Sequence, residues 1–133
     1  MAKLIDMLLG AGDKITGRPT AALRISRLSE ICGNDFVFEI RGLTQKEISN
    51  LGESTSKADF IIAGVTNFDF GDKELSEALK PEGRSTPLFP PEVVDAILLP
   101  GEKNAICDKI FELSGFGVNA VKEIEKNSKP TRK

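Results

Sequence analysis

The residue types that most often carry enzyme chemistry are thinly represented, because the 133-residue chain contains no histidine. Histidine is the commonest general base and metal ligand near neutral pH. Its absence excludes Ser-His and Cys-His nucleophile pairs and histidine-containing zinc sites. Only chemistry based on carboxylates or on lysine is left open, so we expect a protein that is not an enzyme.

One acidic cluster consists of Asp69, Asp72 and Glu74. Carboxylates around a loop attract Ca²⁺, but a calcium loop needs ligands at alternating positions, and Phe68 and Phe70 interrupt that spacing. Asp72 is well placed to cap a helix, and Glu74 would then lie in the first turn, where the helix dipole favours a negative charge. We therefore predict no metal site in this cluster.

Three further motifs have simpler structural explanations. Gly10-Ala11-Gly12 lacks the preceding strand and the third glycine of a dinucleotide-binding loop, so it is interpreted as a turn that ends a helix. Ser114 lies outside the strand-to-helix context of a nucleophile elbow and has no histidine partner. Cys107 is expected to be a small buried residue on a helix. The sequence predicts no catalytic residue, no cofactor and no metal.

Composition limits the classes of partner. Hydrophobic residues make up 40% of the chain, enough for a modest core, and charged residues make up 29%. The net charge of -2 argues against nucleic acid or anionic lipid as the main partner. No apolar run approaches the ~20 residues that span a bilayer. Cys32 and Cys107 are isolated in sequence, as is typical of reduced thiols, so we expect a cytoplasmic protein.

Alternation between apolar and polar residues predicts two strands, over residues 21–26 and 36–41. In the second strand Phe36, Phe38 and Ile40 share one face. We expect the strands to pair antiparallel and this face to pack on helices, because two strands alone are marginally stable.

Helical spacing of apolar residues, with a Thr44-x-x-Glu47 capping box, predicts most of the remaining elements. The segment 58–65 fits a helix or a strand, and its apolar pairs at i, i+4 favour a helix. The predicted helices outside the central region are residues 2–9, 27–32, 44–51, 58–65, 73–80 and 118–127.

The core is expected around residues 89–117, where two apolar stripes flank a break at Pro100-Gly101. Proline cannot continue the hydrogen-bond ladder, so the first helix should stop there, and Gly115 and Gly117 should end the second. We expect the two apolar faces to close on each other. The stripes consist of Val93, Val94, Ile97 and Leu98, and of Ile106, Ile110 and Leu113.

Three marginal segments complete the domain prediction. The helix at residues 2–9 is too short to be stable alone, so we predict that it docks and closes one edge of the core. Residues 81–87, PEGRSTP, carry no apolar side chain and are the first candidate for disorder within the domain. Residues 128–133 are predicted to be a disordered basic tail, which leaves a single domain over 1–127.

Together these elements predict an α+β fold that is mostly α. A small antiparallel sheet of two or three strands should pack on a helical bundle with a C-terminal helix-turn-helix pair. Large apolar side chains near turns either cap this core or form an exposed patch for a partner. These side chains are Phe68, Phe70, Leu88, Phe89 and Phe116.

Several of these segments also carry a family resemblance. LLPGE at residues 98–102, followed by a helix ending in ELSGF at 112–116, resembles the C-terminal region of the XkdN-like tail assembly chaperones of long-tailed phages and PBSX-like prophages of Gram-positive bacteria. FVFEIRGLT at 36–44 is similar to the family's strand-then-helix segment, and FDFGDKELSEAL at 68–79 to its loop-then-helix segment. The resemblance covers roughly residues 20–120.

The resemblance implies a non-enzymatic, cytoplasmic protein that acts in phage or prophage tail morphogenesis. It would bind the long helical tape measure protein, keep that client from aggregating and aid assembly of the tail tube, so the tape measure protein and possibly the tail tube protein would be its partners. It also implies a possible longer, frameshifted form of the chain itself. The family supplies no catalytic residues.

A helical client would be read by an apolar groove at positions i, i+3, i+4 and i+7. Two other interpretations stay open: a structural tail component, such as a connector or terminator subunit retained in the particle, and a small enzyme that uses carboxylates alone. We predict the partner-binding surface at Leu88, Phe89, Val93 and Phe116, with Phe68 and Phe70 next to it.

Overall fold

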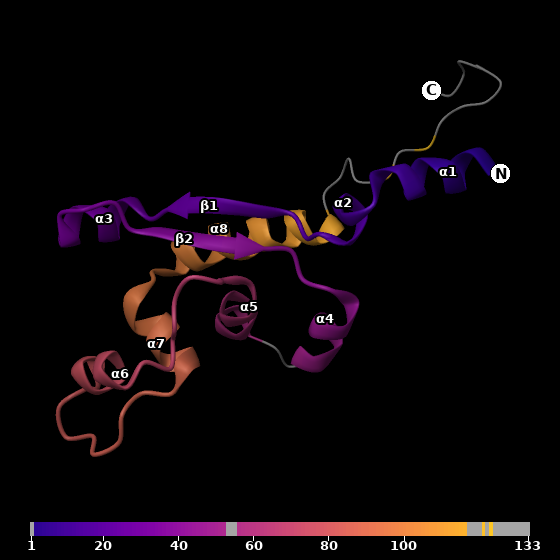
Figure 1. The fold of residues 1–133 in the computed structure, drawn as a ribbon. Helices are drawn as coiled ribbons and strands as arrows, with labels where there is room; N and C mark the ends of the chain where they lie inside the picture. Colours follow the sequence, from indigo (N-terminus) through magenta and orange to yellow (C-terminus); the bar gives the residue numbers. More distant parts are fainter. Residues whose placement is uncertain (1, 53–55, 117–120, 122, 124–133) are drawn as a thin grey trace, which may run out of the picture.

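The computed structural model describes residues 2–52, 56–116, 121 and 123. Within them, one small antiparallel sheet lies against a layer of helices, which confirms the predicted mostly-α α+β fold (Figure 1). The elements are α1 (Ala2–Ala11), α2 (Asp13–Thr16), β1 (Thr20–Arg24), α3 (Ser26–Cys32), β2 (Val37–Arg41), α4 (Gln45–Leu51), α5 (Lys57–Gly64), α6 (Lys73–Leu79), α7 (Pro90–Ile97), α8 (Pro100–Phe111) and the π-helical turn η1 (Glu112–Phe116).

The sheet pairs β1 with β2 antiparallel, with Leu23 opposite Phe38 and Ala21 opposite Ile40. Phe38 and Ile40 are buried, as their alternation predicted, while Val37 and Glu39, which alternate with them, are exposed. Val65 adds a single bridge to Ile40, so no third strand forms in the part of the chain that the structure describes.

Helix α5 is the centre of the helical layer, and both α7 and α8 pack on it (Figure 1). Gly64 makes the close approach possible, because a Cβ atom there would lie 2.5 Å from Cδ1 of Ile110 on α8. The expectation that the α7 and α8 faces close mainly on each other was therefore wrong. Their stripes are buried except for Ile97 and Leu113, which are half-buried, but α5 supplies the common surface.

Two helices begin with the same local design. Pro90 and Pro100 occupy first-turn positions, where the missing N–H costs nothing. Glu92 and Glu102 then accept hydrogen bonds of 2.8 Å from the N–H groups of Phe89 and Leu99. Pro100 therefore starts α8, whereas the sequence analysis had assigned it to the end of the preceding helix.

Arginines hold both of these glutamates. Arg27 on α3 pairs with Glu102 through two hydrogen bonds of 2.9 Å and donates a third to the carbonyl of Ile97. Arg84 pairs with Glu92 through two bonds of 2.8 Å. These charge-assisted pairs fix the starts of α8 and α7 against segments that are distant in sequence or irregular.

The connector at residues 81–87 has a defined structure, which corrects the prediction of disorder. Arg84 donates hydrogen bonds to the carbonyl groups of Thr86 and Pro87 as well as to Glu92. The sequence analysis counted apolar side chains and missed that one guanidinium group can organise a polar segment through its several donors.

The prediction for the N-terminal helix was only half correct. α1 forms, but it does not close an edge of the core: Leu4, Ile5, Met7, Leu8 and Leu9 are between 56% and 74% exposed. Its principal neighbour is the short helix α2, and in Figure 1 it extends beyond the end of the sheet.

The predicted helix at 118–127 and tail at 128–133 lie outside the described residues, apart from 121 and 123. Gly115, in η1, has a φ of 95°, as expected of a glycine that ends a helix. Among the described segments, no helix combines the length and apolar character needed to cross a membrane.

Candidate partner-binding groove

Helix α4 forms one wall of an apolar groove between α4, α5 and α8, and hydrogen bonds fix the first turn of this helix. Thr44 and Glu47 form the predicted capping box, with hydrogen bonds of 3.2 and 3.0 Å between each side chain and the other's N–H group. Glu47 also accepts bonds of 2.8 and 3.0 Å from Arg18. The hydrogen bond from the Thr44 N–H has the largest effect on the pKa of Glu47, which it lowers, and the bond from Arg18 lowers this pKa further. α4 is thereby tied to the segment before β1.

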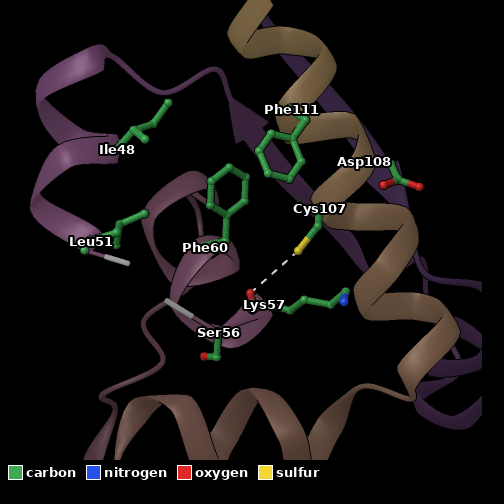
Figure 2. Close-up of a pocket in the computed structure, with 9 residues that line it drawn as sticks. Ile48, Leu51, Ser56, Lys57, Phe60, Cys107, Asp108 and Phe111 are labelled. Carbon is green, nitrogen blue, oxygen red and sulfur yellow. Dashed lines mark hydrogen bonds between the residues drawn. The ribbon is translucent and has the colours of Figure 1, made fainter. Parts of the chain in front are cut away.

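The groove lies between α4, α5 and α8 and encloses about 420 Å³ (Figure 2). Its walls are mainly apolar, and Figure 2 shows the rings of Phe60 and Phe111 facing each other at its centre. The side chains that line it are Ile48 and Leu51 from α4, Lys57 and Phe60 from α5, and Cys107, Asp108 and Phe111 from α8, with Gly52 and Ser56 at one edge.

Three phenylalanines connect the core to the surface along this groove. The Phe60 and Phe111 rings are stacked, with centroids 4.3 Å apart, and Phe116 meets Phe111 edge-on at 5.6 Å. Phe60 is buried, whereas Phe111 is 42% and Phe116 is 63% exposed. We call Phe60, Phe111 and Phe116 the aromatic ladder, and its outer two members present apolar area to solvent.

Cys107 lines the groove and is not a reactive thiol. It is buried, as predicted, and its Sγ–H group donates to the Lys57 carbonyl at 3.6 Å. Burial raises the pKa of the thiol, so the reactive thiolate is disfavoured.

Two opposite charges stand beside the apolar walls. Lys57 projects from α5 and Asp108 from α8, and both residues line the groove, although Figure 2 shows the Asp108 carboxylate pointing away from the Phe60 and Phe111 rings. Neither of these groups forms an ion pair within the described residues. Both groups are available to pair with a charged partner. Because their charges are opposite, they distinguish the two possible orientations of a bound helix.

The structure divides the predicted partner-binding residues between different environments. Val93 and Phe70 are buried, because α7 turns Val93 toward α5 and the loop side chain Phe70 joins the phenylalanine cluster under the sheet. Phe68 is half-buried in that same cluster, within 4.7 Å of Phe70 between ring centroids. Val93 and Phe70 therefore expose almost no surface in this structure.

Leu88 and Phe89 lie at the start of α7, away from the groove. Leu88 is half-buried and donates its N–H to the Ser76 carbonyl, while Phe89 is 66% exposed with the Arg84 guanidinium 5.9 Å from its ring centroid. Of the six predicted residues only Phe116 adjoins the groove, and Figure 1 shows the beginning of α7 and the end of α8 in different parts of the molecule.

The sequence analysis did not name Ile48, Leu51, Phe60 or Phe111 as candidates for a binding surface, because apolar residues on predicted helices are most simply core residues. Phe111 carried a usable signal: it stands beside the Ile106–Ile110 stripe and not within it, so a helix that buries that stripe leaves Phe111 at the edge. The other three could not be distinguished from core residues without knowing how α4 and α5 pack.

A comparison with protein families matches residues 50–127, more than half of the chain, to the phage XkdN-like tail assembly chaperone protein family. The chain belongs to this family of phage tail assembly chaperones. The match confirms the predicted family and includes Leu51, Phe60, Phe111 and Phe116, whereas Ile48 precedes it. Neither a curated protein nor a solved structure was found to match the chain.

Proposed function

We propose that this tail assembly chaperone acts without enzymatic turnover and binds an amphipathic helix of the tape measure protein in the groove between α4, α5 and α8. The observation that carries the proposal is the aromatic ladder, which leads from buried Phe60 to exposed Phe111 and Phe116 inside the segment that the family shares. A chaperone that holds an aggregation-prone client needs exposed apolar surface of this kind.

The form of the groove suits a helix. Its walls are themselves helices, and a third helix can lay an apolar stripe between two others, with residues at i, i+3, i+4 and i+7 as anchors. Aromatic residues are the side chains most often found as energetic anchors at protein interfaces. The resemblance to the family supplies the client: a long helical protein whose apolar surface needs protection before the tail tube encloses it.

The unpaired charges at the rim give such a complex a direction. A client helix with an acidic residue near Lys57 and a basic residue near Asp108 would pair with both, and the reversed helix would place like charges together. We expect this to affect orientation more than affinity, because exposed ion pairs contribute little free energy.

The wider setting follows the family. We place the protein in the bacterial cytoplasm during tail assembly, with the tail tube protein as a possible second partner and a longer frameshifted form of the chain as a possible third. These partners remain predictions from the resemblance, and retention in the finished particle is the alternative role.

The test is co-expression with the tape measure protein, followed by titration of its soluble helical segments. A groove variant, Phe111→Gln with Phe116→Gln, keeps good helix-forming residues but removes the exposed part of the ladder. We expect it to raise the dissociation constant by at least about tenfold and to return the client to the insoluble fraction. Circular dichroism must show that the fold is retained, and Phe116→Gln alone gives a milder variant.

Phe89→Gln is the matched control, since Phe89 is as exposed as Phe116 but lies at the start of α7. Loss of client binding in Phe89→Gln and not in the groove variant would place the site at the originally predicted surface. Finding the chain in purified particles by mass spectrometry would instead favour a structural tail component.

A further inference from the structure

The helix α1 presents an unusual amount of apolar surface for its length. Five of its ten residues are large apolar side chains that are more than half exposed. An isolated helix of this length is unstable in water, because too few hydrogen bonds offset the cost of nucleation. Within the described part of the chain its principal contact is the four-residue helix α2, which buries none of its own residues. α1 therefore needs a further packing partner.

The faces of α1 define what that partner must look like. Leu4 and Leu8 share one stripe, and Ile5, Met7 and Leu9 widen it on both sides. Lys3 and Asp6 lie together on the opposite, narrow polar stripe. A helix with so broad an apolar face fits between two walls, since one flat neighbour would leave a flank exposed.

The groove between α4, α5 and α8 has matching properties. Its two walls are helices lined by Ile48, Leu51 and Phe111, so it is apolar where α1 is apolar. Lys57 and Asp108 beside it are unpaired within the described residues, as are Lys3 and Asp6 of α1. Each surface carries one positive and one negative charge next to an apolar face, which allows two complementary pairs in a single orientation.

We infer that α1 of one molecule docks in the α4–α5–α8 groove of a second copy of this chain. α1 then acts as an internal substitute for the client helix, and client binding and self-association become mutually exclusive at the groove. The inference rests on the proposed function, because it gives the proposed client groove a second occupant.

The geometry favours a second copy over the same molecule. Figure 1 shows α1 directed away from α4 and α5, beyond the end of the sheet, so that its apolar face is open to an approaching molecule. Donor helix and acceptor groove are different surfaces, so two molecules can exchange their α1 helices reciprocally and bury two such contacts at once.

The test uses two variants of the full chain that each lack one half of the contact. Leu4→Gln with Leu8→Gln removes the apolar stripe of α1 but keeps helix-forming residues, and Phe111→Gln with Phe116→Gln removes the exposed ladder. Sedimentation velocity over a range of concentrations should show self-association of the natural sequence that weakens at least about tenfold in each variant. Ile31→Gln, on the exposed face of α3, is the control and should associate normally.

Mixing supplies the decisive measurement. An equimolar mixture of the two variants contains one intact α1 and one intact groove, so it should form a one-to-one complex at concentrations where each variant alone is monomeric. A natural sequence that stays monomeric, variants that associate unchanged, or a mixture that remains separate would each overturn the inference. A monomer whose client affinity rises in the α1 variant would indicate docking within one molecule and would also overturn it.

The two proposals fail in different ways. If the α1 variant associates normally while the groove variant loses the tape measure segment, the exchange is wrong and the chaperone groove stands. If the groove variant loses self-association but binds the tape measure segment normally, the groove serves self-assembly and the proposed client site is wrong.

Discussion

Helices α1 and α8 show how two apolar helices of one chain can have opposite environments. α8 buries Ile106, Cys107 and Ile110, whereas α1 has a denser set of large apolar side chains and leaves all five largely exposed. The difference lies in the neighbours. α8 meets α5 at Gly64, where the missing side chain admits Ile110, and no such complementary surface faces α1 within the described chain.

The comparison teaches that an apolar pattern predicts that a helix face will be covered but does not say by what. For α8 the cover is the same chain, and its side chains contribute to folding stability. For α1 the described part of the chain supplies no such cover, and under our inference a second copy supplies it, so its side chains should contribute to association and hardly to folding. Substitutions in the two helices can separate these contributions.

The largest expected effect is that of Ile110→Ala. Ile110 is fully buried against α5, so its truncation loses buried area and leaves a cavity, and we expect the free energy of unfolding to fall by about 2–5 kcal/mol. Leu8→Ala, in α1, should change it by less than about 0.5 kcal/mol. Urea unfolding followed by circular dichroism, at concentrations where the chain is monomeric, measures both. Equal losses would mean that α1 packs on its own core and would end the distinction.

A smaller effect is expected from Gly42→Ala. A Cβ atom at Gly42 would press on the carbonyl oxygen of Leu113, a backbone atom that cannot rotate away, so we expect destabilisation of about 1–3 kcal/mol in thermal unfolding. Gly10→Ala adds the same methyl group in α1, where no atom beyond the adjoining residues and the helix's own backbone lies within 4 Å. It should instead favour the helix by up to about 1 kcal/mol, visible as added helicity without loss of melting temperature.

The elements of the fold were largely predictable from local patterns. The alternation of Phe36, Phe38 and Ile40, the capping box at Thr44 and the N-cap at Asp72 each act over a few residues, and each has the predicted role. The packing was less predictable, because it depends on which surfaces meet. The sequence does not reveal that both α7 and α8 pack on α5. Nor does it reveal that the missing side chain of Gly64 leaves room for Ile110.

The same limit applies to the candidate site residues. Phe70 and Phe89 are both phenylalanines next to turns, yet Phe70 is buried in an aromatic cluster and Phe89 is exposed beside Arg84. Residue type could not separate them. The ion pairs were also missed, since Arg27 and Glu102 are 75 residues apart in sequence and no local pattern links them.

The smallest expected effect is a loss of folding stability in acid. It concerns the start of α7, which, like α8, packs on α5. Hydrogen bonds from Arg84, and then from the N–H group of Phe89, lower the pKa of Glu92 from its usual 4.5 to about 2. Because the folded-state pKa is the lower one, this contribution to stability is present above about pH 4.5 and is lost as the pH falls toward 2.

Glu92→Gln removes this pH-dependent contribution. We expect the variant to melt below the natural sequence at about pH 6 and to lose less melting temperature between about pH 6 and pH 3. The effect should be small because the pair is partly exposed to solvent. Glu82→Gln is a matched control in the connector that carries Arg84, since Glu82 forms no ion pair among the described residues.

Hydrogen exchange provides a second measurement. Acid should speed the exchange of amides in α7 and in the connector while leaving the exchange of α1 unchanged. If acid released α1 first, its packing would depend on the charged start of α7, and the two helices could not be treated as independent.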